Sequence, residues 1–287
     1  MRYWFLAIRP KTLSLSLAPV IAGIALAWRE THLFQLLPAL AALCGAMLIQ
    51  IGTNLHNDAK DFERGADTEE RLGPPRATAQ GWLTIEMVKR GAHIAFTLAF
   101  VIGLYLVWHG GWPILAIGLI SLLAGYAYTG GPKPIAYSAS GELFVFLFFG
   151  LVAVLGSYFL QTLTLSLNAL AVACAIGFLA AAVLLVNNYR DLQSDRKAGK
   201  LTLTHYLGEH RSQKFYALLI LTPFLLPLML AELDADVWLV FLALPFAWLL
   251  LHRFISEKPG PAFNQILART ALLQLLYSLL LTSALLL

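Results

Sequence analysis

Charged residues are scarce in this chain. Asp, Glu, Lys and Arg together make up 13% of its 287 residues, whereas they make up roughly a quarter of a typical soluble domain. Apolar residues make up 59%, and the mean hydropathy is +0.72. Because so few charges cannot cover the surface of a water-soluble fold, the composition predicts a polytopic membrane protein with the lipid bilayer as its surroundings.

Cysteine and the common catalytic signatures are also scarce. Cys44 and Cys174 lie far apart inside apolar runs without CxxC spacing, so they indicate neither a metal site nor an oxidising compartment. None of the 7 histidines has HExxH spacing, and no GxSxG, Walker or GxGxxG pattern is present. These absences argue against the common hydrolases and nucleotide-driven enzymes.

Long apolar runs are what the chain has instead. A transmembrane helix needs about 20 mostly apolar residues. Some runs here are short or adjoin Gly and Pro, which leaves a count of eight open, but the charge distribution favours nine. We therefore predict an all-α protein with one domain over residues 1–287 and nine transmembrane helices. The predicted windows are 12–28, 35–55, 92–109, 112–130, 142–160, 168–189, 215–232, 237–255 and 265–286.

Basic residues are distributed unevenly between the connections of these windows. If the N-terminus is cytoplasmic, all of the 20 Lys and Arg residues except Arg29 fall on the cytoplasmic side. By the positive-inside rule, the N-terminus and the long connections are cytoplasmic and the C-terminus is external. The net charge of +4 then reflects membrane orientation and requires no nucleic-acid partner.

Two of the cytoplasmic connections carry matching polar motifs. The first begins NLHNDAKDFERG, and the second begins NNYRDLQSDRKAG. At helical spacing, the Asn and the two Asp residues of each motif fall on one helix face. Their repetition predicts two related halves, of about 1–140 and 141–287. The matching residues are Asn54, Asp58, Asp61 and Gly65 in the first motif, and Asn187, Asp191, Asp195 and Gly199 in the second.

Acidic side chains next to hydrocarbon require cationic partners. A charged side chain at the membrane centre costs about 2.5–3.5 kcal/mol on insertion scales. Oxygen ligands without His or Cys suit Mg²⁺, which binds through a few carboxylates together with substrate phosphate oxygens. One DxxxD alone is typical of a solvated helix end, but two matched copies favour a clamp for a diphosphate between metal ions. The basic residues that such an anion requires are Lys60, Arg64, Arg190, Arg196 and Lys200.

These paired motifs resemble those of the UbiA-type intramembrane prenyltransferase superfamily. Four stretches are similar to its 1,4-dihydroxy-2-naphthoate branch, and the resemblance extends from about residue 9 to the last helices. They are RPKTLSLSLAP from Arg9, NDAKDFERGADTEERLGPPR from Asn57, YTGGPKPIAYSASGE from Tyr128 and NNYRDLQSDRKAGKLTL from Asn187. The double proline at Pro74 and Pro75 departs from the expected single proline and affects only loop detail.

The resemblance implies a UbiA-type helical bundle with both acidic motifs on cytoplasmic loops of a bacterial inner-membrane enzyme. It implies Mg²⁺-dependent transfer of a polyprenyl group from polyprenyl diphosphate to 1,4-dihydroxy-2-naphthoate, with loss of CO₂ and diphosphate, giving demethylmenaquinone. The implied site residues are Asp58, Asp61, Asp191 and Asp195 as metal ligands; Asn54 and Asn187 orienting metal or phosphate; Lys60, Arg64 and Lys200 holding the diphosphate; Arg71 or Arg76 holding the acceptor carboxylate; and Tyr128 against the acceptor ring.

Other functions remain open at the level of sequence. A related enzyme that transfers a phytyl group or prenylates 4-hydroxybenzoate would share most of these motifs. A secondary transporter would also have repeated halves and buried acids, but its site would lie near the membrane midplane on broken helices. For the enzyme, we expect a long apolar groove between helices to hold the prenyl tail.

Overall fold

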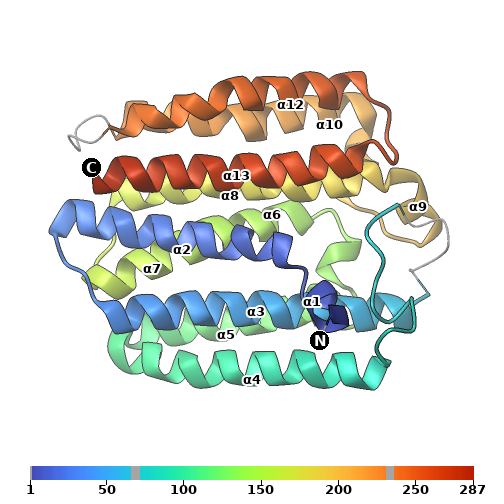
Figure 1. Ribbon diagram of the computed structural model, residues 1–287, viewed down its shortest axis with the longest axis horizontal. Helices are drawn as coiled ribbons and strands as arrows, with labels where there is room; N and C mark the ends of the chain where they lie inside the picture. The colour runs from blue at the N-terminus through green and yellow to red at the C-terminus, as the bar shows by residue number, and fades with distance from the viewer. Residues whose placement is uncertain (1, 66–71, 231–235) are drawn as a thin grey trace.

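A computed structural model describes residues 2–65, 72–230 and 236–287. Its long helices run side by side along one axis, and the described residues contain no strand (Figure 1). The uninterrupted long helices are α2 (Pro10–Thr31), α3 (Leu36–Glu63), α4 (Ile85–Gly110), α5 (Trp112–Ala127), α8 (Leu167–Arg190) and α13 (Phe263–Leu286).

The other transmembrane segments are composite. The first joins α6 (Gly141–Val145), the π-helical η2 (Phe146–Val152) and α7 (Ala153–Thr162). The second joins α10 (Leu203–Leu221), η3 (Thr222–Leu225) and α11 (Leu226–Met229). The third joins η5 (Val237–Ala243) and α12 (Leu244–Ser256). The three short helices are α1 (Arg2–Ala7), η1 (Ile135–Tyr137) and α9 (Leu192–Lys197).

Each of the nine predicted apolar windows falls on one of these segments. Within the described ranges, eight segments are long and apolar enough to cross a membrane, and α5 is a shorter apolar helix of 16 residues. The prediction of an all-α polytopic membrane protein is therefore confirmed, with nine as an approximate count. The division into two related halves stays a prediction.

Two predicted helix starts are wrong by several residues. The helix predicted at 92–109 begins at Ile85, after Thr84 caps it by accepting a hydrogen bond from the backbone N–H of Met87. The segment predicted at 215–232 begins at Leu203 and bends at Gly208, whose φ is 70°. Hydropathy misses these first turns because their charged side chains lower the average without preventing helix formation.

Helix α8 is the central helix of the bundle, with most of its length buried. It packs closely against η2, where Gly150 meets Gly177. A Cβ atom at Gly150 would lie 2.5 Å from the carbonyl oxygen of Ala173, so a larger residue there would push the two helices apart. This close contact fixes α6, and the loop before it, relative to the end of α8.

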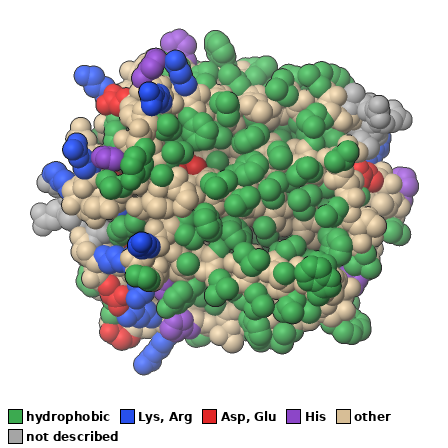
Figure 2. Space-filling model, turned by 180° about the vertical axis from the view of Figure 1, so that it is seen from behind, with side chains coloured by type: hydrophobic (Ala, Val, Ile, Leu, Met, Phe, Trp, Pro, Cys, Tyr) green, Lys and Arg blue, Asp and Glu red, His purple; other side chains and the backbone are tan. Residues whose placement is uncertain are grey.

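The two ends of the bundle differ in polarity. Hydrophobic side chains cover the middle of the surface, and Lys, Arg, Asp and Glu side chains gather mainly at one end (Figure 2). Helices α1 and α9 lie toward this end, whereas α13 finishes at the opposite end (Figure 1). We call this the polar end; it comprises residues 54–65, 72–84, 128–140 and 187–202, and both acidic motifs belong to it.

Candidate active site

Asn54 ties α3 to the start of α2. Its side chain is buried, and its amide nitrogen donates hydrogen bonds to the carbonyl oxygen of Ile8 and the hydroxyl of Thr12, both at 2.9 Å. Its amide oxygen accepts a hydrogen bond from Gln50 at 3.2 Å. The structure therefore places Asn54 in helix packing, and its role in orienting metal or phosphate stays a prediction.

Asp58 anchors the connection that follows α3. Its carboxylate accepts hydrogen bonds from the backbone N–H of Ala77 at 3.0 Å, from the N–H of Thr78 at 3.2 Å, and from the hydroxyl of Thr78. Asp58 is 1% exposed. Three donors therefore surround both carboxylate oxygens, and they hold the segment that carries Arg76 against α3.

Asp61 and Arg76 form a buried ion pair. The guanidinium Nη2 of Arg76 lies 2.5 Å from one Asp61 oxygen, and its Nη1 donates to the carbonyl oxygen of Asn57 at 2.8 Å. The second Asp61 oxygen accepts a hydrogen bond from the hydroxyl of Tyr137 at 3.0 Å. Asp61 is thus oriented from two sides, by a cation and by a neutral donor.

The second motif is organised by Arg190, which is 3% exposed at the end of α8. Its Nε and Nη2 donate to the two oxygens of Asp191 at 2.8 and 2.5 Å. The guanidinium also donates to the amide oxygens of Asn187 at 3.0 Å and Asn264 at 2.9 Å. Asn264 in turn donates to the carbonyl oxygen of Leu72, so this network joins the second motif to the first connection.

The spacing predicts that the second motif lies on one unbroken helix, but the structure shows a break within it. Helix α8 ends at Arg190, Asp191 has φ −92° and ψ 11°, and α9 begins at Leu192. The backbone N–H of Asp195 nevertheless donates to the carbonyl oxygen of Asp191 at 2.8 Å, so the two aspartates remain one turn apart. The bend redirects α9 across the polar end.

Asp195 has the least satisfied carboxylate of the four aspartates. One oxygen lies 3.4 Å from the ammonium of Lys200, and the other is buried without a hydrogen-bond partner among the described residues. Burial raises the pKa of Asp195, while the neighbouring Lys200 lowers it. A buried, unpartnered carboxylate oxygen is a position where a cation would be bound favourably.

Tyr137 connects the two acidic motifs. Its hydroxyl bonds Asp61, while the Lys200 ammonium and the Arg64 guanidinium lie 5.3 and 5.1 Å from its ring centroid. Its carbonyl oxygen also accepts a hydrogen bond from the N–H of Leu201 at 3.2 Å. Burial and the Asp61 charge raise the pKa of Tyr137, so its hydroxyl stays protonated and donates.

The remaining predicted residues have varied positions. Lys60 pairs with Glu63 at 2.8 Å on the same helix. Arg64 donates to the carbonyl oxygens of Thr129 at 2.5 Å and Gly131 at 2.7 Å, so it holds the α5–α6 connection. Arg71 lies outside the described residues. Tyr128, the last of the predicted set, lines the cavity described next.

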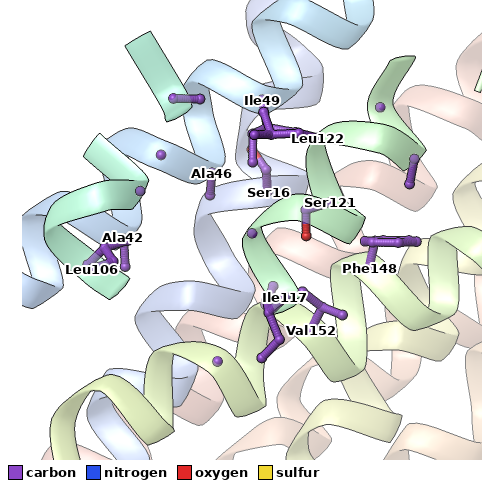
Figure 3. A pocket seen from close by; sticks show the side chains of 18 of the residues that line it. Ser16, Ala42, Ala46, Ile49, Leu106, Ile117, Ser121, Leu122, Phe148 and Val152 are labelled. Atoms are coloured by element: carbon purple, nitrogen blue, oxygen red, sulfur yellow. The ribbon is translucent and has the colours of Figure 1, made fainter. Parts of the chain in front are cut away.

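An apolar cavity of about 240 Å³ begins beside Tyr128 and continues between α2, α3, α4, α5 and the α6–η2–α7 segment. Gln50 and Thr53 lie near its polar end, and Ile114 and Leu160 lie toward the opposite end. Small side chains such as Ala46 leave the space, and larger ones such as Phe148 border it (Figure 3). A cavity of this kind fits the groove that the sequence predicts for a prenyl tail.

The polar end suits Mg²⁺ in the chemistry of its donors, although these donors are not gathered around one point. Among residues 2–65, 72–230 and 236–287, no three His, Cys, Asp or Glu side chains are arranged to hold a metal ion. The Arg76 guanidinium pairs with Asp61 and the Arg190 guanidinium pairs with Asp191, so each carboxylate already has a positively charged partner, as it would have in a metal site. These oxygen donors and the unpartnered Asp195 oxygen fit a hard divalent cation.

Sequence reasoning missed several polar residues that complete this end. Tyr137 and Glu142 belong to the stretch YTGGPKPIAYSASGE, from which only Tyr128 was predicted to act, so that stretch held the signal. Asn57 is buried and accepts a hydrogen bond from the Thr129 hydroxyl at 2.6 Å. Asn264 carries no local signal, because its importance comes from contacts with residues far away in the sequence.

A helical membrane bundle with carboxylates and basic groups at one end of an apolar cavity defines an intramembrane protein suited to an amphiphilic, anionic ligand. The sequence profile of the UbiA prenyltransferase family matches residues 16–281, and the chain belongs to this family. A similar relative is the 1,4-dihydroxy-2-naphthoate octaprenyltransferase of Escherichia coli K12, which is 38% identical over 96% of this chain and 92% of the relative. The enzyme of that name from Mycobacterium tuberculosis H37Rv is 36% identical over 98% and 96%.

Solved structures share the fold at low sequence identity. A UbiA homolog from Archaeoglobus fulgidus bound to GPP and Mg²⁺ superposes with a TM-score of 0.67 at 16% identity, over 99% of both chains. A UbiA homolog from Aeropyrum pernix K1 gives a TM-score of 0.69 at 13% identity, over 96% of this chain and 97% of the other. These similarities concern the fold of the bundle.

Proposed function

We propose that this protein transfers a polyprenyl group from polyprenyl diphosphate to 1,4-dihydroxy-2-naphthoate, with Mg²⁺ as cofactor. Diphosphate and CO₂ leave, and the product is demethylmenaquinone. One observation carries the proposal: at one end of an apolar cavity, Tyr137 contacts Asp61 of the first acidic motif and Lys200, which follows the second. Relatives that match nearly the whole chain and bear the name of this activity support the choice of acceptor and donor.

Asp61, Asp191 and Asp195 would hold the Mg²⁺, with the amide oxygen of Asn187 beside them. When bound, the metal neutralises the diphosphate and makes it a better leaving group. Asp58 is also proposed as a ligand by its place in the motif, but its three hydrogen bonds to Ala77 and Thr78 give it a second role. That role is to keep the connection after α3 folded over the site.

Basic residues around the carboxylates would bind the diphosphate. Lys200 is the best placed, because it lies between Asp195 and the Tyr137 ring. Arg64 reaches the same ring while it holds the α5–α6 connection. Lys60 faces Glu63 and would have to leave that exposed pair, which costs little because such pairs contribute about 0–1 kcal/mol.

The prenyl tail would occupy the apolar cavity, with its reacting end beside Tyr128. The acceptor ring would then meet it at the polar end and contact Tyr128. Arg71 is proposed to hold the acceptor carboxylate. Arg76 can share this role only if Asp61 turns toward a metal ion, because the guanidinium otherwise pairs with Asp61.

The location of the protein completes the proposal. It is an integral membrane protein, and we propose the bacterial inner membrane with the polar end in the cytoplasm. The basic residues concentrated at that end support this orientation. A water-soluble prenyl diphosphate head group would then reach the site from the cytoplasm while its tail enters from the bilayer.

The proposal is tested with purified protein in lipid nanodiscs, radiolabelled polyprenyl diphosphate and 1,4-dihydroxy-2-naphthoate. Label should move into an organic-soluble quinol product in the presence of Mg²⁺, and chelation by EDTA should stop the transfer. Adding 4-hydroxybenzoate in place of the naphthoate is the control for acceptor identity. Transfer to 4-hydroxybenzoate alone, or none to either acceptor, would contradict the proposal.

A further inference from the structure

Glu142 is a buried acidic residue that the diphosphate site does not use. It lies in the first turn of α6 and is 2% exposed. One carboxylate oxygen accepts a hydrogen bond from the Asn188 amide at 2.9 Å, and the other is buried without a partner among the described residues. Among the described residues, no ion pair below 4.0 Å joins this carboxylate to a Lys or Arg, whereas Asp61, Asp191 and Asp195 each have one.

The position of Glu142 places it next to the reacting end of the cavity. Asn188, its partner, immediately follows Asn187 and precedes Asp191 by three residues on α8. Phe144 and Val145, which follow Glu142 on α6, line the cavity together with Tyr128. Burial raises the pKa of Tyr128 most; the charges of Glu142, Asp61 and Asp195 raise it further, and the charge of Arg9 lowers it. Glu142 therefore belongs to the same end of the cavity as the two motifs.

An intramembrane carboxyl group that has no cationic partner is costly, and such groups usually mark a functional site. Packing alone would be satisfied by Gln at this position, because Gln offers the same acceptor to Asn188. What a carboxylate adds is the ability to take a proton. This rests on the proposed function, in which a dihydroxylated aromatic acid is prenylated on a ring carbon.

The proposed reaction requires a place for one proton. When the ring carbon attacks the prenyl carbon, the C–O bond to diphosphate breaks and its electron pair leaves with diphosphate. The neighbouring hydroxyl becomes a ketone, its O–H electron pair forms the C=O bond, and its proton must be accepted. Loss of CO₂ then returns an electron pair to the ring, and the enolate oxygen takes a proton back to give the quinol.

We propose that Glu142 is the group that accepts this hydroxyl proton and returns it after CO₂ has left. Its unpartnered oxygen receives the acceptor hydroxyl, and the Asn188 amide keeps the other oxygen fixed. The carboxylate is regenerated in each cycle, so no additional acid or base is consumed. The cavity beyond Tyr128 is lined mainly by apolar side chains, which offer no group that could take the proton.

The test compares Glu142→Gln with Glu142→Asp in the nanodisc assay. General base catalysis contributes about 10²- to 10⁴-fold, so Glu142→Gln should lower kcat by that factor while binding of a non-reactive prenyl thiodiphosphate is unchanged. Glu142→Asp keeps a carboxylate and should retain measurable transfer. The matched control is Glu30→Gln at the opposite end, where the carboxylate is bonded by Tyr158 and Asn168; it should leave kcat unchanged.

A second acceptor separates proton transfer from a purely structural effect. With a fluorinated naphthoate whose hydroxyl is already ionised at the assay pH, the Glu142→Gln enzyme should approach the wild-type rate. The inference would be overturned if Glu142→Gln kept full kcat, or if it lost the same factor with both acceptors. If Glu142→Gln fails to fold, a folded Glu142→Asp enzyme that binds the thiodiphosphate but shows no measurable transfer overturns it. Wild-type transfer in the same assay reports on the proposed function separately.

Discussion

Asp58→Asn should loosen the connection after α3, and this effect should be present even without Mg²⁺. The carboxylate accepts three hydrogen bonds from Ala77 and Thr78, and an amide can offer only one acceptor oxygen. In the best orientation, the new NH₂ group faces the N–H of Ala77, and an unsatisfied buried donor costs about 1–3 kcal/mol. Each of the two remaining bonds changes from charged to neutral and loses about 1 kcal/mol. The sum is about 3 to 5 kcal/mol.

Hydrogen exchange measures this loss directly. Without Mg²⁺, the Ala77 and Thr78 amides of the Asp58→Asn variant should exchange about 10²- to 10⁴-fold faster than in the wild type, since 1.36 kcal/mol corresponds to a factor of ten. Asp191→Asn is the control, because its carboxylate bonds Arg190 and not these amides. Unchanged exchange at both amides, with weaker Mg²⁺ binding as the sole effect, would refute the anchoring role of Asp58.

Three further changes test the rest of the site. Tyr137→Phe removes one hydrogen bond to the Asp61 carboxylate, worth about 1.5–3 kcal/mol for a charged acceptor, so kcat/KM for prenyl diphosphate should fall about 10- to 150-fold; a wild-type value would rule out the bridging role. Asp195→Asn should raise the Mg²⁺ concentration for half-maximal rate by at least about tenfold, because even residues next to metal ligands change affinity that much, and an unchanged requirement would remove Asp195 from the ligand set. A reporter fused after Leu287 should read as external; a cytoplasmic reading would contradict the proposed orientation.

Hydropathy was sufficient to predict the bundle because each membrane crossing is encoded locally. A run of about 20 apolar residues has no stable alternative to a helix in hydrocarbon. The same averaging could not find the start of α4 at Ile85 or of α10 at Leu203, where charged side chains continue the helix into the polar end. Those turns depend on capping and helix propensity, to which hydropathy does not respond.

The candidate site was predictable in its residue types and less so in its contacts. Spacing predicts Asp61 and Asp195 as metal ligands, and the structure buries both beside basic groups. Their role as ligands stays a prediction. The bridge through Tyr137 depends on a contact across 76 positions of the chain, which one sequence does not reveal. Glu142 and Asn188, separated by 46 positions, were missed for the same reason.

The fate of the acceptor carboxyl carbon tests the central claim most directly. Purified protein in nanodiscs would be given Mg²⁺, an unlabelled polyprenyl diphosphate and 1,4-dihydroxy-2-naphthoate labelled in its carboxyl group. The account predicts that label appears as CO₂ in proportion to the prenylated quinol formed, and that EDTA stops both. Label retained in a prenylated product, or product formation without release of labelled CO₂, would contradict it.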